Sequence, residues 1–401
     1  MSGPPSAPSR SRSRSRRPAA RLGTGFGAIA IAIAAAAIIW LPFVEFKTSR
    51  IATGRPLSLF ASLATGWGPA VAASLVLGAA IASFAAGLRT RLIAALLGFA
   101  VVALAVGRAA EALTPAGNRI ARISPGAGCW VLLLAFGLMA TNALSRFRLR
   151  PARRVLALLA TAAVVYAAFA AGLFDQLSVM REYTVNAGGF AREARRHLLL
   201  AAGSIAPAVL VGVPIGVLCH LIPPVRAAVL QTLNLIQTIP SIALFGILMV
   251  PLGALATAHP WLGELGVRGI GAAPALIALF LYALLPVATS TVVGLGRVSA
   301  AAIDAARGMG LTHGQVLRAI ELPLALPSIL TGIRIVLVQN IGLATIAALI
   351  GGGGFGTFVF QGIGQTAIDL VLLGAIPIVV LGFSCAVLLD ALVDLLQGTP
   401  P

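Results

Sequence analysis

The stretch Asp304–Gly310, DAARGMG, and the segment Ile320–Pro323, IELP, decide the interpretation of this 401-residue chain. Together they form a short polar island with arginines at its edges, and long apolar runs lie on both sides of it. A polar island between two apolar runs of membrane-spanning length predicts a loop at one face of a bilayer. We delimit this loop as residues 297–324.

The overall composition also predicts a membrane protein. Mean hydropathy is +1.00, and 59% of the residues are hydrophobic while only 10% are charged, which lies outside the range of soluble domains. The apolar runs are continuous and do not alternate with polar residues, so helices are favoured over a β-barrel. We expect an all-α polytopic membrane protein with about ten transmembrane helices, at residues 23–44, 66–87, 92–113, 128–145, 155–174, 198–220, 227–253, 271–296, 325–350 and 369–394.

Changes in composition along the chain predict four segments. We expect a disordered basic cytoplasmic tail at 1–22, a transmembrane module of about five helices at 23–174, a periplasmic connector at 175–197 and a second transmembrane module at 198–395. Within the connector, Ala191–Arg196 is expected to form an amphipathic helix on the outer surface. Only the second module carries recurrent polar residues, prolines and glycines inside its spans, so we expect function to reside there.

The formal net charge of +18 indicates membrane topology more than nucleic-acid binding. Most of the 29 Lys and Arg residues fall in clusters that lie on one side of the membrane if the N-terminus is cytoplasmic. The same orientation places the loop 297–324 in the cytoplasm. The alternating Arg-Ser segment at 10–17 resembles an RNA-binding tail, but a basic tail near anionic headgroups accounts for it more simply. We expect a bacterial inner-membrane protein with no nucleic-acid partner.

The span 227–253 contains a cluster of uncharged polar side chains. Offsets of three, four and seven residues place them on one helical face, and Pro240 predicts a kink in this helix. A polar face inside a membrane indicates either the lining of a translocation pathway or hydrogen bonds between helices, and the sequence favours neither. Together with an amide pair in a later span, the candidate pathway residues are Asn234, Gln237, Thr238, Pro240, Ser241, Gln339 and Asn340.

The glycine run Gly351, Gly352, Gly353 and Gly354 resembles a phosphate-binding loop but lacks the Gly-Lys-Ser/Thr that would complete one. The topology places it outside, where we expect a turn that permits close helix packing or a periplasmic gate. The chain contains no nucleotide-binding motif, so we expect no bound cofactor and no catalytic residue. The scattered cysteines and histidines show no metal or disulfide pattern, and we interpret them as incidental: Cys129, Cys219, Cys385, His197, His220, His259 and His313.

The spacing of Asp304-Ala305-Ala306, Gly310 and Ile320-x-Leu322-Pro323 resembles the EAA loop of ATP-binding-cassette (ABC) importer permeases. That family usually has Glu where Asp304 stands. Further motifs between about 197 and 395 resemble its osmoprotectant branch, which imports glycine betaine, choline, carnitine or proline betaine. These motifs are Gln237–Ser241, Leu279–Pro286, Ala305–Gly310, Glu321–Pro327 and Ala347–Gly351.

This resemblance implies a type I importer permease core of five helices at the C-terminal end of the chain. It implies a second permease subunit, identical or not, separate cytoplasmic ATPase subunits that use ATP, and an external substrate-binding protein. The residues implied to form the coupling loop that docks on the ATPase are Asp304, Ala305, Ala306, Gly310, Ile320, Leu322 and Pro323.

The residue types of this loop suit such a role. Two small alanines allow close approach to a partner, Gly310 allows a sharp turn, and Asp304 is expected to cap the short helix or contact the ATPase. Three alternatives remain open: a secondary transporter of a small polar solute, an ABC permease for amino acids or small anions, or a membrane scaffold or sensor. No acidic residue is placed clearly at the middle of a span in the second module, which argues against ion coupling.

Overall fold

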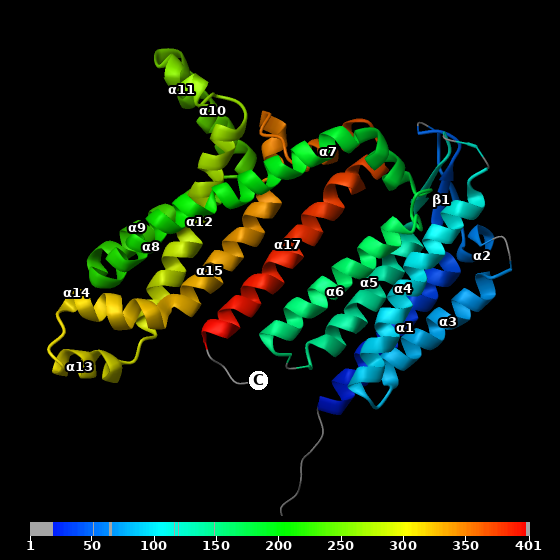
Figure 1. The fold of residues 1–401 in the computed structure, drawn as a ribbon, viewed down its shortest axis with the longest axis horizontal. Coiled ribbons are helices and arrows are strands. Elements are labelled where there is room, and N and C mark those ends of the chain that lie inside the picture. The colour runs from blue at the N-terminus through cyan, green and yellow to red at the C-terminus, as the bar shows by residue number, and fades with distance from the viewer. Residues whose placement is uncertain are drawn as a thin grey trace, which may run out of the picture. The chain divides into compact units, whose positions relative to one another are not determined.

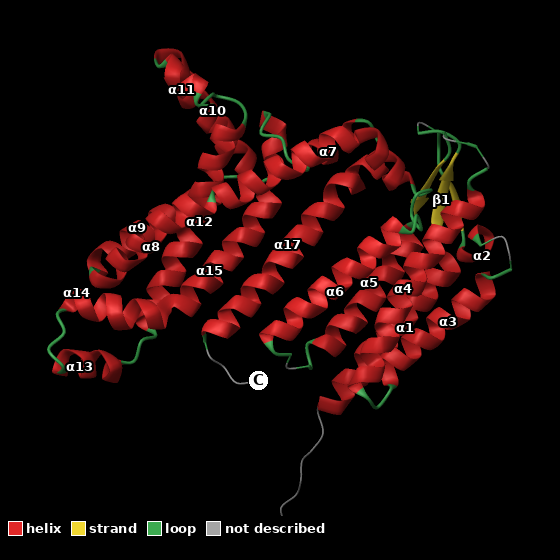
Figure 2. Ribbon diagram, in the orientation of Figure 1, coloured by secondary structure: helices red, strands yellow, loops and turns green. Residues whose placement is uncertain are grey.

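The computed structural model describes residues 19–50, 52–63, 66–115, 117–118, 120–147 and 149–397, and most of this part is helical (Figure 2). In it, eight helical segments are long and apolar enough to cross a membrane, and two shorter apolar helices cover 27–40 and 68–84. Nine of the ten predicted spans coincide with one of these segments, whereas the predicted span 227–253 overlaps the segment 241–258 only over its second half. The agreement follows from the requirement that a chain in hydrocarbon satisfies its backbone hydrogen bonds within the segment. Most of the predicted tail, residues 1–18, lies outside the described residues.

The chain forms two compact units, residues 1–147 and 148–401. The sequence predicted the division between the modules at residue 174. In the structure it falls after residue 147, and the helix at 151–170 belongs to the second unit by its contacts. The expected connector at 175–197 is almost entirely helical and continues into the second module. The candidate functional residues all lie in the second unit.

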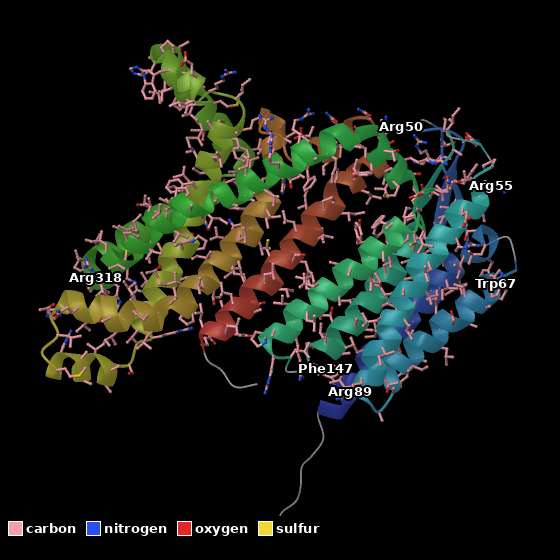
Figure 3. The ribbon with its side chains drawn as sticks, in the orientation of Figure 1. Arg50, Arg55, Trp67, Arg89, Phe147 and Arg318 are labelled. Carbon is pink, nitrogen blue, oxygen red and sulfur yellow. The ribbon has the colours of Figure 1, made fainter. Side chains whose placement is uncertain are left out.

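The first unit combines apolar helices with a small sheet that the sequence did not predict. Its helices are α1 (Ala19–Trp40), α2 (Leu59–Ser62), α3 (Gly68–Phe84), α4 (Leu88–Leu113) and α5 (Ala127–Leu144). Strands β1 (Val44–Lys47), β2 (Arg55–Leu57) and β3 (Arg122–Pro125) form an antiparallel sheet in the order β2-β1-β3, with Val44 opposite both Leu57 and Pro125. Figure 3 shows Arg50 and Arg55 at the sheet end of this unit and Arg89 at the opposite end.

The second unit consists of helices only, within the described residues. They are α6 (Pro151–Ala170), α7 (Ser178–Gly203), α8 (Ile205–Leu221), α9 (Pro223–Thr238), α10 (Ser241–Ala258), α11 (Pro260–Glu264), α12 (Ala272–Gly296), α13 (Ala300–Gly308), α14 (His313–Val316), the π-helical turn η1 (Leu317–Glu321), α15 (Leu322–Leu343), the 3-10 turn η2 (Ile346–Ile350), α16 (Gly356–Gly364) and α17 (Ile368–Leu396). In Figure 1, α13 and α14 lie at one end of this unit, and α7 crosses the opposite end of α15 and α17.

Helix α12 forms the centre of the second unit and packs along both α8 and α15. Small residues permit this close packing. A Cβ atom at Gly216 of α8 would lie 2.5 Å from Cβ of Thr291, and one at Gly332 of α15 would lie 2.3 Å from Oγ of Ser290. Any side chain at these two glycines would therefore push the helices apart.

The predicted span 227–253 is two helices, so the expectation of one kinked helix was wrong. Helix α9 ends at Thr238 and α10 begins at Ser241, with Ile239 and Pro240 in extended backbone conformations. Proline supplies no backbone N–H and disfavours helical geometry in the residue before it, which explains a complete break at this point.

Helix α17 is joined to two neighbours by ion pairs one turn apart. Asp390 pairs with Arg334 of α15, and Asp394 pairs with Arg154 of α6 at 2.8 Å. The two aspartates are four residues apart and share a side of α17. These pairs hold α6, α15 and α17 together near the C-terminal end of α17.

Candidate functional site

A cavity of about 300 Å³ lies at the break between α9 and α10. Five of the seven predicted pathway residues line it: Gln237, Thr238, Pro240, Ser241 and Gln339. The sequence did not point to the other three lining residues, which come from the break and from the facing helices: Ile239, Tyr282 and Leu343. All polar groups in this lining are amides, hydroxyls and backbone groups, so the cavity wall carries no formal charge.

Helix α12 holds the break in shape through two hydrogen bonds. The Gln237 side chain donates from Nε2 to the carbonyl oxygen of Tyr282 at 2.6 Å, and the Tyr282 hydroxyl donates to the carbonyl oxygen of Ile239. Carbonyl groups at the end of a helix lack a partner within that helix. The tyrosine therefore satisfies a backbone group that the break exposes, and the same tyrosine lines the cavity.

The other two predicted pathway residues do not line the cavity. Asn234 lies on the exposed surface of α9. Asn340 is fully buried, and its Nδ2 donates to Oγ of Ser204 at 2.7 Å and to the carbonyl oxygen of Leu279 at 3.3 Å. Asn340 thus takes the alternative role that the sequence left open, a hydrogen bond between helices.

The predicted coupling loop forms helix α13, which is capped differently from the prediction. The side chain of Ser299 accepts a hydrogen bond from the backbone N–H of Ala302, so Ser299 is the N-cap. Asp304 lies in the middle of the helix, and the expectation that it caps α13 was wrong. Serine is among the residues preferred at this position because its oxygen reaches an unpaired backbone N–H.

Helix α13 exposes several small residues on one side, and the exposed side chain of Arg307 lies at the edge of this face. Asp304 and Ala305 are exposed, together with Ala301 and Gly308, whereas Ala306 is buried against the rest of the loop. The chain then turns at Gly310, whose φ of 83° is the left-handed conformation that glycine adopts without strain. Such a face allows the backbone of a partner to approach α13 closely.

The second half of the loop returns to the bundle through the π-helical turn. Ile320 is the fourth residue of η1, and Leu322 and Pro323 begin α15. Glu321 is buried, and its Oε2 lies 3.9 Å from Nε2 of His220. Arg318, labelled in Figure 3, marks this end of the second unit.

The glycine segment Gly351–Gly354 forms a turn that packs against α7. Gly351, Gly353 and Gly354 have φ angles of 77°, 77° and 88°, and all but Gly351 are buried. The carboxylate of Glu193 on α7 accepts hydrogen bonds from the backbone N–H of Gly354 at 2.7 Å and from Oγ1 of Thr357 at 3.3 Å. This is close packing of a turn on a helix, and it involves a glutamate that sequence reasoning did not select.

His197 has a structural role that the sequence did not reveal. It is fully buried, Nε2 lies 3.0 Å from the carbonyl oxygen of Ile341 at the end of α15, and its ring lies 5.2 Å from that of Phe355. Glu193 and His197 are one helical turn apart on α7. Their spacing at the start of an apolar run was the available signal that both face the interior.

Two family models match the chain. Residues 21–180 match the N-terminal domain of the ABC transporter permease YehY, and residues 212–398 match the binding-protein-dependent transport system inner membrane component. The first match covers helices for which the sequence offered no motif. The second contains the cavity, α13 and the glycine segment.

Curated relatives match the C-terminal half. The osmoprotectant import permease protein OsmW of Salmonella typhimurium is 42% identical over 53% of this chain and 92% of its own length. The glycine betaine/carnitine/choline transport system permease protein OpuCD of Bacillus subtilis is 34% identical over 54% of this chain and 84% of its own length. A solved structure of the MetNI methionine ABC transporter is 24% identical over 52% of this chain and 95% of its own, with a TM-score of 0.45.

Proposed function

We propose, from the premise that this chain belongs to the family of binding-protein-dependent transport system inner membrane components, that it imports small osmoprotectants. The substrate class is that of glycine betaine, choline and carnitine. The observation that carries the proposal is the 42% identity to an osmoprotectant import permease over 92% of that protein's length. A multi-pass transport subunit with no nucleotide-binding motif of its own fits this role.

The cavity at the break between α9 and α10 supports the substrate class. Its polar lining is uncharged, and Tyr282 adds the only aromatic ring. A zwitterion such as glycine betaine or carnitine needs no fixed countercharge in the wall, and the choline cation can interact with the partial charges of the amide and hydroxyl oxygens. A strong countercharge would slow the release of either kind of solute. We assign Gln237, Thr238, Ser241 and Gln339 to the translocation pathway on this basis.

The exposed face of helix α13 supports the proposal that a separate subunit supplies the energy for transport. A separate ATPase subunit docks on the exposed face that contains Asp304 and Ala305, and the turn at Gly310 leads the chain from α13 toward α14. ATP is bound by that partner, and this chain holds no cofactor. The complete importer contains a second permease subunit and a substrate-binding protein outside, in the inner membrane of a bacterium, with the N-terminus of this chain in the cytoplasm.

Uptake of labelled glycine betaine tests both halves of the proposal. Cells without their own betaine systems express this chain with its ATPase and binding protein, either unchanged or as Ala305→Arg. Arginine on the small face of α13 separates the two subunits, so uptake falls at least about tenfold while the membrane level of the protein is unchanged. Ala258→Arg, the same substitution at an exposed position at the end of α10 and outside the loop 297–324, is the matched control and retains uptake.

The outcomes separate the parts of the proposal. Full uptake by Ala305→Arg contradicts the docking of an ATPase on α13 and favours a secondary carrier. A complex that hydrolyses ATP in response to its binding protein yet takes up no betaine, choline or carnitine remains an importer, but its substrate class is then a different one.

A further inference from the structure

Three polar side chains in the cavity wall donate their hydrogens to backbone carbonyl oxygens. Nε2 of Gln237 donates to the carbonyl oxygen of Tyr282. The hydroxyl of Tyr282 donates to the carbonyl oxygen of Ile239. Oγ1 of Thr238 donates to the carbonyl oxygen of Leu235 at 2.7 Å. A carbonyl oxygen can only accept a hydrogen bond, so the direction of all three bonds is fixed. What these side chains mainly keep for a solute is oxygen lone pairs.

The orientation of the Gln237 amide follows from a proline in α12. Pro286 lies inside this helix and supplies no backbone N–H. In an α-helix that N–H would bind the carbonyl oxygen four residues earlier, which here is that of Tyr282. Gln237 provides the missing donor from α9, at 2.6 Å. The amide nitrogen is thereby held against α12, and Oε1 is the part of the amide that is left for the cavity.

The hydrogen-bond acceptors of the wall gather on α9 and α12. Helix α9 ends at Thr238, so the carbonyl oxygens of its last turn add to the partial negative charge at this end. The other polar side chains of the wall can donate as well as accept, and they belong to other elements: Ser241 to the start of α10, whose first N–H groups are donors too, and Gln339 to α15. The cavity wall carries no formal charge, but its α9 and α12 side carries a partial negative charge.

We propose that this side of the cavity recognises the cationic group of a solute through the oxygen lone pairs of Gln237, Thr238 and Tyr282. The inference rests on the proposed function and deepens it, because the quaternary ammonium group is the part that glycine betaine, choline and carnitine share. Oxygen dipoles attract a cation without the strong hold of a carboxylate, which suits a site that must also release its solute. Pro286 is a positioning residue for this selection, since it keeps the amide nitrogen of Gln237 turned away from the solute.

The test measures the charge preference of the cavity directly, with two thiol reagents of similar size and opposite charge. The complete importer carries Ile239→Cys, at a position that lines the cavity, and alanine in place of the three native cysteines of this chain. The reagents are 2-(trimethylammonium)ethyl methanethiosulfonate and 2-sulfonatoethyl methanethiosulfonate, and the mass of this chain follows their reaction. The ratio of the two rates, divided by the same ratio for 2-mercaptoethanol in solution, is the cation preference of the cavity.

Two variants change the wall without changing its formal charge. In Gln237→Leu/Pro286→Ala the acceptor amide is lost, while the new N–H at position 286 binds the carbonyl oxygen of Tyr282 within α12. In Pro286→Ala alone, the same N–H releases the Gln237 amide, whose nitrogen then turns toward the solute. We expect the cation preference to fall about threefold to tenfold in the double variant and about twofold to fivefold in the single one.

Thermal unfolding separates this role from a purely structural one. Gln237→Leu alone leaves the carbonyl oxygen of Tyr282 without its donor and is expected to lower the unfolding temperature, and the addition of Pro286→Ala is expected to restore it. The cation preference does not recover with it. Pro377→Ala, at a proline inside α17 that is not part of the cavity lining, is the matched control and leaves the preference unchanged.

An unchanged cation preference in both variants overturns the proposal. So does a preference that recovers together with the unfolding temperature, since Gln237 then only holds the helices in place. A thiol at position 239 that neither reagent reaches in any nucleotide state also overturns it, because the cavity is then closed to solutes. A complex that shows the expected preferences but takes up no osmoprotectant refutes the proposed substrate and supports this inference, whereas betaine uptake with unchanged preferences does the reverse.

Discussion

The hydroxyl group of Tyr282 on α12 donates a hydrogen bond to the carbonyl oxygen of Ile239, at the point where α9 ends and α10 has not begun. The two residues are 43 positions apart in the chain. The tyrosine is buried, and its own carbonyl oxygen accepts from Gln237, so the break is tied to α12 twice. These two hydrogen bonds fix the shape of the break, which would otherwise be flexible. The cavity lies against this break.

Removal of this hydroxyl tests how far the cavity depends on it. We expect Tyr282→Phe to lower the free energy of unfolding by about 1 kcal/mol, because the partly buried carbonyl group of Ile239 loses its partner. Uptake is expected to fall with it. Thermal unfolding of the purified protein in detergent measures the first effect, and Tyr166→Phe, at a tyrosine that is 75% exposed on α6, is expected to change neither quantity.

The polarity of the cavity wall is tested at Gln339. We expect Gln339→Leu to reduce the rate of uptake by roughly tenfold with little change in unfolding temperature, because the amide faces the cavity and leucine is of similar volume. Gln231→Leu, on the exposed surface of α9, is the control. Equal effects of the two substitutions on uptake would remove Gln339 from the pathway.

The glycine turn is tested at Gly354. Its φ of 88° is costly for any other residue, and a Cβ atom there would lie 3.0 Å from Nδ1 of His197. We expect Gly354→Ala to destabilise the protein by about 1–2 kcal/mol, visible as a lower unfolding temperature. Gly364→Ala, where no atom lies within 4 Å of the added Cβ, should be silent by the same measurement.

The ion pair between Arg334 and Asp390 is tested by a charge exchange. We expect Asp390→Asn to lower the free energy of unfolding by about 1–2 kcal/mol. This value lies between those of exposed and buried ion pairs, because the two side chains are 30% and 43% exposed and the arginine lies within a membrane helix. Arg334→Asp combined with Asp390→Arg is expected to recover part of this stability. A Glu111→Gln substitution, which breaks an ion pair exposed on both sides, should leave the unfolding temperature unchanged.

The sequence predicted the helices well because the physical constraint on them is local. An apolar run of about 20 residues satisfies its backbone in hydrocarbon as a helix, and every predicted run except 227–253 appears as one. Local signals also found most of the cavity, since Gln237, Thr238 and Ser241 are polar residues clustered beside a proline. The sheet of the first unit was missed because its strands contain three or four residues, too few for the alternation in Val44–Lys47 to be distinguished from chance.

The remaining errors concern contacts between distant positions. Glu193 meets Gly354 across 161 residues, and His197 meets Ile341 across 144. Nothing in the immediate neighbourhood of either residue encodes its partner. The kink expected at Pro240 became a break because the missing amide of the proline and the hydroxyl of Tyr282 act together, and only the fold brings the tyrosine there.

The close packing of α8 and α15 on α12 determines which parts of this protein are free to move. With Gly216 against Thr291 and Gly332 against Ser290, the three helices interlock at fixed heights, and sliding one past another would drive backbone into side chain. We expect the three helices to move as one rigid body. The exchange between outward-open and inward-open shapes that an importer requires is then expected to move these three helices as one body against the second permease subunit, and the Ile239–Pro240 break moves with them because two hydrogen bonds tie it to α12.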